Sequence, residues 1–532
     1  MIIKIKNGSL QIIKNVLLFL YELNRKENQS LFKMPQGRKN IFIFRRTKKM
    51  NAKLKRTLLC TLSGVMAISA LAGCGGGSKN SATTEDGRVR LLITTSQKDV
   101  NEEEYNKAVK RYAEFEQYYK ETYPDSKGVS VEPHYYGFNV KDYAAMAAGD
   151  QLATFYYVPL TEAKGIMDAG YAKDITKWME EYGYLQGIDE KIRKNIERDG
   201  KIYLMPTAVY SVGLAVNMDL MKQAGYVEAD GTPHQPATFE ELAQMAGEIT
   251  KKTGKPGFIM PTTGNAGGWR FTPVAWAYGV KFMEQDADGN WKATFNTPEC
   301  VEALQWVKDL KWKYNAIPEN VLMDNAKQRN AFGAGEAAMT FAEGSSTSTF
   351  LAGGMQKDNL GFIQMPAGPK RHVTLIGGSY NVFNSNATDE QIDAAFKYLD
   401  WAGSGRVLDD AVKAKMQEDI QLKIDKGEQI GVLNSSPYTD DDPKRAYEIM
   451  LNTKSPEEGG FRNVDENLVK LYNDQSGIEW QQEEPVEAQA LYAALENAIQ
   501  AVLTDENADC AKLIEEAYKN FQVTLDTVNN AA

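Results

Sequence analysis

The chain has 532 residues, of which 43% are hydrophobic and 25% charged, and its formal net charge is −10. This acidic balance argues against nonspecific binding to nucleic acid and provides no bulk attraction for anionic substrates. The four cysteines are too few for a disulfide framework.

The first 49 residues differ in composition from the rest of the chain. About half of them are Ile, Lys, Asn or Phe, and they include no Ala and no Asp. This bias is typical of translated AT-rich upstream DNA, whereas "MNAKLKRTLL" from Met50 is a complete start for an export signal. We therefore predict that Met50 is the true start and that residues 1–49 are spurious. A real basic arm that binds nucleic acid or a membrane is the alternative.

Residues 50–73 have the pattern of a signal peptide. Three basic residues precede an apolar segment, Thr57–Ala72, that is shorter than a spanning helix requires. The following Leu71–Cys74 resembles the bacterial lipobox, which implies cleavage before Cys74 and a diacylglycerol with palmitate on its thiol. An ordinary buried helix with a chance cysteine is the alternative. We expect residues 74–87, rich in Gly, Ser, Asn and Thr, to be a flexible tether.

The mature chain predicted from this cleavage is too long for a single domain, and it is more acidic than the full chain. It has 459 residues, which predicts two or three domains. Residues 1–49 hold twelve Lys/Arg and two Glu, and residues 50–73 hold three more Lys/Arg, so the net charge from Cys74 onward is about −23.

Strand and helix patterns alternate after residue 87. Residues 88–97, 128–136 and 153–158 have strand patterns, and residues 102–119 and 140–150 have helical spacing between them, which argues for a parallel α/β sheet. Further on, Thr297 and Pro298 begin a predicted helix to residue 314, and residues 485–502 form another. Cys300 and Cys510 lie in helical patterns and are predicted to be free thiols, although one bridge between them is possible.

Three segments resemble the family-1 extracellular solute-binding proteins of ABC importers. They are "DGKIYLMPTAVYSVGLAVNMDLMKQAGYVEADGTPHQPATFEELAQMAGEIT" (199–250), "NAFGAGEAAMTF" (330–341), and the stretch from "LGFIQMPAGP" to "AAFKYLDW" (360–401). The resemblance implies an α/β, two-lobed periplasmic-binding-protein-like fold of type II, with a hinge and an interlobe cleft. On this basis lobe 1 comprises 88–208 plus about 376–430, and lobe 2 comprises 209–375 plus about 431–532. Crossings between lobes are expected near 207–210, near 373–378 and around 425–435.

The same resemblance implies a function. The chain would be a monomeric receptor that captures a sugar or oligosaccharide and delivers it to the permease of an ABC importer. It would be exported and lipid-anchored to the outer face of the membrane of a Gram-positive-type bacterium. No cofactor, metal or nucleic acid is implied. The same fold could instead bind a peptide, a polyamine or a uronate, and a surface glycoside hydrolase, which needs two facing carboxylates, is the remote alternative.

Sugar sites combine aromatic rings, which stack on the apolar faces of the sugar, with polar groups for its hydroxyls. Trp269 follows a Gly-rich loop and is the strongest candidate, with Arg270 beside it. Alternatively, Trp269 anchors the loop in a core and Arg270 lies in solvent. The other candidates are polar or aromatic residues at strand ends, loops and crossings: Tyr210, Ser96, Gln97, Tyr157, Glu343, Ser379, Tyr380 and Trp480.

Two positions depart from the family pattern. Many relatives have Pro-Asp where this chain has Ala153 and Thr154, and Gly-x-Trp where this chain has Ser345 and Ser346. The missing Trp argues against a pocket of the malto-oligosaccharide type. The expected ligand class is carbohydrate, without a specific sugar.

Overall fold

The computed structural model describes residues 81–99, 101–134 and 140–531. The predictions for residues 1–80, which include the start at Met50, the signal peptide, Cys74 and most of the tether, lie outside this range. Within Ser78–Ala532, two large hydrophobic cores divide the chain into two lobes. The first core draws on residues 91–205 and 380–399, and the second on residues 212–375 and 464–525.

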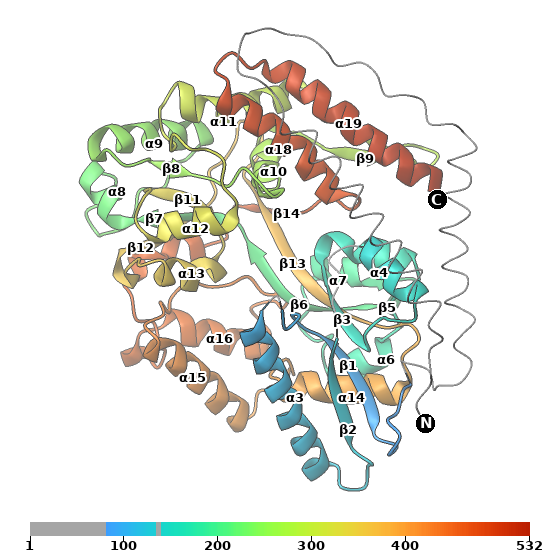
Figure 1. The fold of residues 1–532 in the computed structure, drawn as a ribbon. Coiled ribbons are helices and arrows are strands. Elements are labelled where there is room, and N and C mark those ends of the chain that lie inside the picture. The colour runs from blue at the N-terminus through green and yellow to red at the C-terminus, as the bar shows by residue number, and fades with distance from the viewer. Residues whose placement is uncertain (1–80, 100, 135–139, 532) are drawn as a thin grey trace, which may run out of the picture. The chain divides into compact units, whose positions relative to one another are not determined.

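A mixed sheet forms the first lobe and extends into the connection between the lobes (Figure 1). Its order is β14-β13-β3-β1-β2, and β6 pairs with the other edge of β13. The strands are β1 (Val89–Thr94), β2 (Val129–His134), β3 (Phe155–Pro159), β6 (Leu204–Ser211), β13 (Val373–Phe383) and β14 (Glu479–Gln482). The helices of this lobe are α3 (Glu102–Thr122), α4 (Val140–Ala148), α5 (Ala163–Asp168), α6 (Thr176–Glu181), α7 (Glu190–Ile196) and α14 (Asp389–Trp401), with η1 (Leu160–Glu162) and the hairpin β4 (Glu197–Arg198) and β5 (Lys201–Ile202).

The prediction of a parallel sheet is correct only for part of this sheet. Strands β1, β2 and β3 are parallel, but β13 runs antiparallel to both β3 and β6. The reason is the path of the chain: β13 enters from the second lobe, so it arrives in the opposite direction to a strand that follows a local crossover helix.

The second lobe contains a four-stranded sheet of order β12-β7-β11-β8. The strands are β7 (Gly213–Asn217), β8 (Phe258–Ile259), β11 (Met339–Ala342) and β12 (Leu360–Ile363), with the hairpin β9 (Met283–Gln285) and β10 (Trp291–Ala293). The helices are α8 (Met218–Ala224), α9 (Phe239–Thr253), α10 (Ala266–Tyr278), α11 (Pro298–Trp312), α12 (Asn325–Gly333), α13 (Thr347–Ala352), α17 (Lys470–Asn473), α18 (Ala488–Thr504) and α19 (Cys510–Ala531), with short turns η2 (Gly344–Ser346), η3 (Lys357–Asn359) and η5 (Glu466–Leu468). As predicted, Thr297 caps α11, and Cys300 and Cys510 are free thiols.

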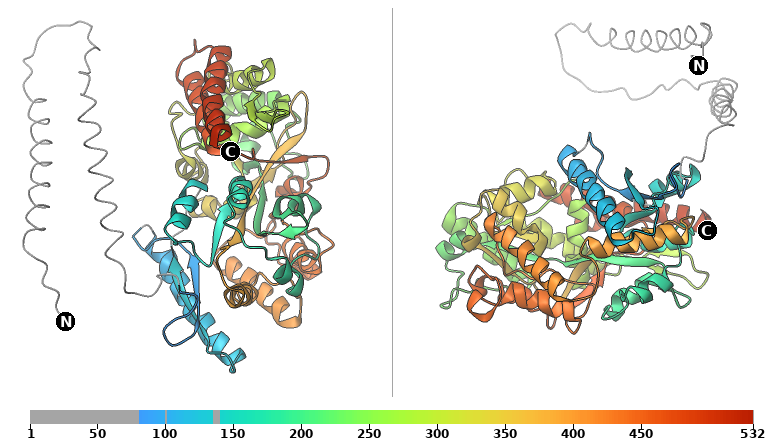
Figure 2. Two further views of the ribbon diagram at one scale, coloured as in Figure 1. Left: turned by 90° about the vertical axis from the view of Figure 1, so that its right-hand side faces the viewer. Right: turned by 90° about the horizontal axis from the view of Figure 1, so that it is seen from below.

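Two further helices form a small unit outside the two large cores. α15 (Asp410–Asp425) and α16 (Pro443–Thr453) lie side by side and share a cluster built on Ile420, Ile430 and Leu451, with η4 (Pro456–Glu458) following them (Figure 2). The lobe limits given above stay a prediction.

Candidate functional site

Two antiparallel strands carry the chain between the lobes. β6 contributes Leu204 and Met205 to the first core, and Val212, directly after it, belongs to the second. β13 begins in the second core at Val373 and ends in the first at Phe383. These strands include the ranges 207–210 and 373–378, where the sequence predicts crossings.

A third crossing lies beside β6. The amide of Leu433 donates to Asn473 Oδ1 (2.9 Å) in the second lobe, whereas the amide of Asp189 in the first lobe donates to Pro437 O (2.9 Å). The chain therefore passes from the second lobe to the first between residues 433 and 437, whereas the crossing predicted around 425–435 runs from the first lobe to the second.

Gly377 in β13 is required by the close approach of Tyr210. A Cβ at Gly377 would lie 2.4 Å from Cζ of the Tyr210 ring, so the ring lies against the glycine. We expect Gly377→Ala to displace Tyr210 and to lower the free energy of unfolding by about 1–3 kcal/mol, as overpacking does. Urea unfolding measures this, with Gly149→Ala as a control, because a Cβ there meets ordinary contacts at 3.4 Å. Equal effects of the two substitutions would contradict it.

The aromatic rings of the site meet at the start of α10. Gly268 allows this helix to approach α18, because a Cβ there would lie 2.0 Å from Tyr492 O. Trp269 is half-buried, and its ring meets the ring of Tyr210 edge-to-face with centroids 6.3 Å apart. The Arg270 guanidinium lies 4.1 Å from the centroid of the Trp269 ring. The structure thus brings together Tyr210, Trp269 and Arg270, three residues that the sequence analysis named as candidates for binding the ligand.

Arg270 and Glu343 form a buried ion pair. Only 1% of Arg270 and 2% of Glu343 is exposed, and Arg270 Nη1 lies 2.5 Å from Glu343 Oε1. Glu343 also accepts from Arg329 (3.0 Å) and from Ser346 (2.9 Å). Burial acts to raise the pKa of Glu343, but Arg270 and Arg329 outweigh it and lower the pKa. Arg270 thus lies against the Trp269 ring, and both members of the pair are shielded from solvent.

Sequence reasoning missed Glu483, which follows β14. Its carboxyl accepts from Tyr492 Oη (2.7 Å) and is hydrogen-bonded by Trp269. Burial, together with a smaller effect of Glu162 in the first lobe, raises the pKa of Glu483 to about 7 against the opposing effect of these hydrogen bonds. No motif marks an isolated Glu after a strand, so the residue emerges only when α10, α18 and β14 come together.

The raised pKa of Glu483 predicts a pH dependence. An acid whose pKa is higher in the folded state favours folding while protonated, so its contribution declines as the pH rises from about 4.5 to about 7. We expect Glu483→Gln to remove this decline and to stabilise the protein more at pH 8 than at pH 5. Urea unfolding at both pH values measures the difference. An effect of equal size at both would show that Glu483 titrates normally.

The other predicted residues fall into two groups. Tyr157 in β3 is 42% exposed, Ser96 is half-buried and Gln97 is exposed, the last two just after β1. Ser379 and Tyr380, in contrast, are buried within β13, where Tyr380 belongs to the first core and is only 1% exposed. Trp480 in β14 packs near Ile376 on the crossing strands and lines a different cavity from Tyr210.

Three cavities lie near the connection between the lobes. A cavity of about 440 Å³, here named cavity A, is lined by Tyr210, Ser345 and Tyr438. Cavity B, of about 500 Å³, is lined by Ser211 and Trp480 and also by Tyr438. Cavity C, of about 670 Å³, lies between Glu162 of the first lobe and Trp291 and Val486 of the second. Tyr210 therefore borders a space large enough for a small solute.

A family model described as bacterial extracellular solute-binding protein matches residues 100–405, which is more than half of the chain. The chain belongs to this family. Membership makes it a solute-binding protein and not an enzyme. Across the part of the chain that the structure describes, none of the helices has the length and apolar character needed to span a membrane.

Solved structures of solute-binding proteins share the fold. A maltose-bound MalE3 of T. maritima has 19% identity and a TM-score of 0.57, and the match covers 82% of this chain and 99% of that one. The GacH receptor of Streptomyces glaucescens, studied with and without acarbose, has 17% identity and a TM-score of 0.56, covering 82% and 98%. UgpB of Mycobacterium tuberculosis, in complex with glycerophosphocholine, has 14% identity and a TM-score of 0.57, covering 83% and 99%. These matches confirm the two-lobed fold.

In this solute-binding protein, part of the site lies outside the matched range. Trp269 and Glu343 fall within residues 100–405, but Glu483 and Tyr492 follow it. The carboxyl that the Trp269 indole hydrogen-bonds therefore comes from a part of the chain that the family model does not cover.

Proposed function

We propose that this protein is a lipid-anchored receptor that captures a sugar or oligosaccharide between its lobes and delivers it to the permease of an ABC importer. The observation that carries the proposal is the group formed by Tyr210 on the crossing strand β6, Trp269 on α10 and Glu483 after β14. Tyr157 adds an exposed ring from the first lobe. The sugar-bound neighbours with the same fold support the carbohydrate class.

The arrangement suits a polyhydroxylated ligand for physical reasons. A half-buried indole and two tyrosine rings offer apolar faces for the C–H faces of a sugar ring. Hydroxyls that enter such a site need partners, because an unpaired buried hydroxyl costs about 1–3 kcal/mol. Glu483 and the polar residues after β1, Ser96 and Gln97, are suited to supply them. Closure of the lobes by hinge rotation would then bury the ligand.

A uronate is disfavoured by one observation. Arg270, the strongest candidate for binding an anionic sugar, already faces the carboxylate of Glu343, so its charge is compensated within the protein. A non-sugar solute is the second candidate, because UgpB binds glycerophosphocholine on the same fold.

A melting experiment tests the proposal. The purified protein is melted with a panel of monosaccharides, oligosaccharides, peptides and polyamines. A ligand present at one hundred times its dissociation constant should stabilise the fold by about 2.7 kcal/mol. A sugar that produces this shift and is recovered chemically unchanged supports a sugar receptor. A shift with peptides or polyamines alone, or with none of the panel, would overturn the carbohydrate assignment.

The lipid anchor makes a separate prediction. If Cys74 carries the lipid, Cys74→Ser should abolish incorporation of labelled palmitate and release the protein from the membrane fraction of a bacterial host. Cys60→Ser is the matched control, because Cys60 lies within the predicted signal peptide and should leave with it. Labelling that persists in Cys74→Ser would contradict the anchor.

A further inference from the structure

Cavity B is separate from the proposed sugar site. Its walls come from Asp189 and Trp480 on the side of the first lobe, and from Tyr472 and Gln475 on the side of the second. Neither Tyr210 nor Trp269 lines it. Cavities A and B share residues 434–436 and Tyr438, so the third crossing segment borders both.

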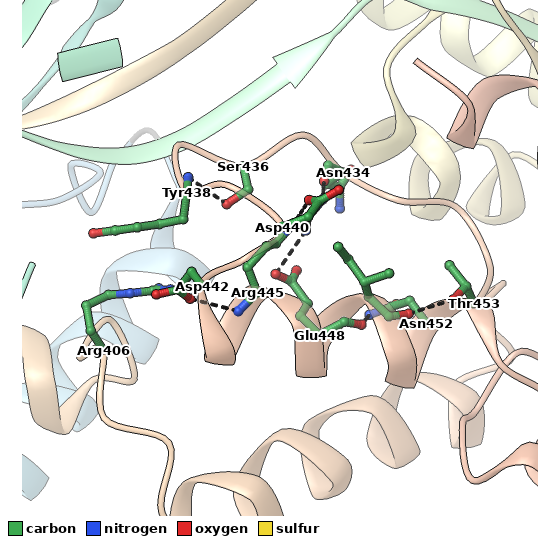
Figure 3. Close-up of polar contacts among 11 residues, drawn as sticks. Arg406, Asn434, Ser436, Tyr438, Asp440, Asp442, Arg445, Glu448, Asn452 and Thr453 are labelled. Atoms are coloured by element: carbon green, nitrogen blue, oxygen red, sulfur yellow. Dashed lines mark hydrogen bonds and ion pairs between the residues drawn. The ribbon is translucent and has the colours of Figure 1, made fainter. Parts of the chain in front are cut away.

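A buried, incompletely satisfied arginine lines this cavity. Arg445 in α16 is only 6% exposed; its Nη1 donates to Glu448 (3.0 Å) and its Nη2 to the carbonyl of Asn434 (2.8 Å) (Figure 3). Its Nε lies 3.7 Å from Asp440 Oδ1, which is too far for a hydrogen bond, and has no other hydrogen-bond partner among the described residues. Because Nε itself has almost no accessible surface, Arg445 contributes a fixed positive charge to the cavity wall and not a donor to an occupant.

The rest of the lining indicates the chemistry of that molecule. Trp480 offers a half-buried ring whose Nε1 donates to Gln475 Oε1 (3.3 Å). Around it, hydroxyls and amides supply both donors and acceptors: Ser211, Asn434, Ser435, Ser436, Thr439, Asn473 and Ser476. The carboxylates of Asp189, Asp440 and Asp474 outnumber the single guanidinium of Arg445, which disfavours an anion.

We propose that cavity B is a second binding site, which takes a neutral polyhydroxylated molecule of about the size of a monosaccharide. The ring of Trp480 stacks on its apolar face, and the hydroxyls and amides that line the cavity bind its oxygens. A volume of about 500 Å³ is within the range of sites for small ligands. Because the walls belong to both lobes, an occupant contacts both at once, and its binding free energy favours the arrangement of lobes seen here.

Equilibrium dialysis of the full chain with labelled glucose, maltose and ribitol tests this proposal by counting sites. We expect that wild type and Trp480→Phe each bind at two sites per chain. Trp480→Ala should lose one site and keep the other, whereas Trp269→Ala should show the reverse. The site that each variant keeps is also its control for folding.

The outcomes separate this proposal from the proposed function. A single site in wild type that disappears in Trp269→Ala would overturn the second site and leave the sugar receptor intact. Two sites that both survive in Trp480→Ala would also overturn it. No binding of any probe would overturn the second site, while the melting panel would still decide the sugar receptor.

Discussion

Trp269→Ala should weaken binding of the sugar identified by the melting panel by about 30- to 150-fold. This corresponds to a loss of about 2–3 kcal/mol, the usual cost of truncating a central aromatic anchor. The expected cause is specific: the substitution removes the ring that meets Tyr210 edge-to-face and the indole that hydrogen-bonds to Glu483. Isothermal titration of the variant measures the loss.

Two further variants test whether the loss comes from the stacking ring of Trp269. Trp269→Phe keeps a stacking ring but removes the donor to Glu483, so it should recover most of the affinity. Trp312→Ala removes a Trp that is 37% exposed on α11 and bonds to Val502 O, away from the site, so it should leave affinity unchanged. The stacking interpretation fails if Trp269→Ala binds as wild type does, or if Trp312→Ala weakens binding equally.

The amino-acid sequence predicted the local elements and the family well, because these depend on short-range patterns. The apolar spacing of residues 102–119 became α3, and Thr297 with Pro298 began α11. The same spacing could not show that β13 returns antiparallel from the second lobe. Strand direction depends on where the chain travels between strands, and no local pattern records that path.

The candidate site was only partly predictable, for a related reason. Trp269 was identified because it follows a Gly-rich loop, and Tyr210 because it stands at a predicted crossing; the structure places their rings together. Tyr380 had the same local signal, yet alternation along β13 turns it into the first core. Glu483 had no signal at all, because its raised pKa results from α10, β14 and α18 packing around it.

Glu343→Gln should lower the free energy of unfolding by about 3 kcal/mol at pH 7. Breaking a buried ion pair on one side typically costs about 3–5 kcal/mol, because the remaining charge is buried without compensation. Here that charge is Arg270, which has almost no access to water, whereas Arg329 is 30% exposed and can be solvated. The glutamine keeps the shape and one acceptor, so the loss should lie near the lower end of this range.

The double variant Arg270→Met/Glu343→Leu distinguishes the cost of an unpaired buried charge from the effect of lost packing on stability. Replacing both partners with apolar residues leaves no buried charge, so stability should return to within about 1 kcal/mol of wild type. Its sugar affinity should nevertheless stay below that of wild type, because the guanidinium that lies 4.1 Å from the Trp269 ring is gone. Urea unfolding and titration, performed on the same samples, measure the two effects independently.

The pH dependence of Glu343 provides the final test. Its pKa is lowered in the folded state, so its contribution to stability is complete above the ordinary range of Glu and is lost as the pH falls through the lowered value. The difference between wild type and Glu343→Gln should therefore be largest at neutral pH and shrink in acid. This direction is opposite to that of Glu483, whose contribution declines as the pH rises. If Glu343→Gln instead had the same effect from pH 7 down to pH 3, the pair would act through shape and not charge, and Arg270 would need another counter-ion.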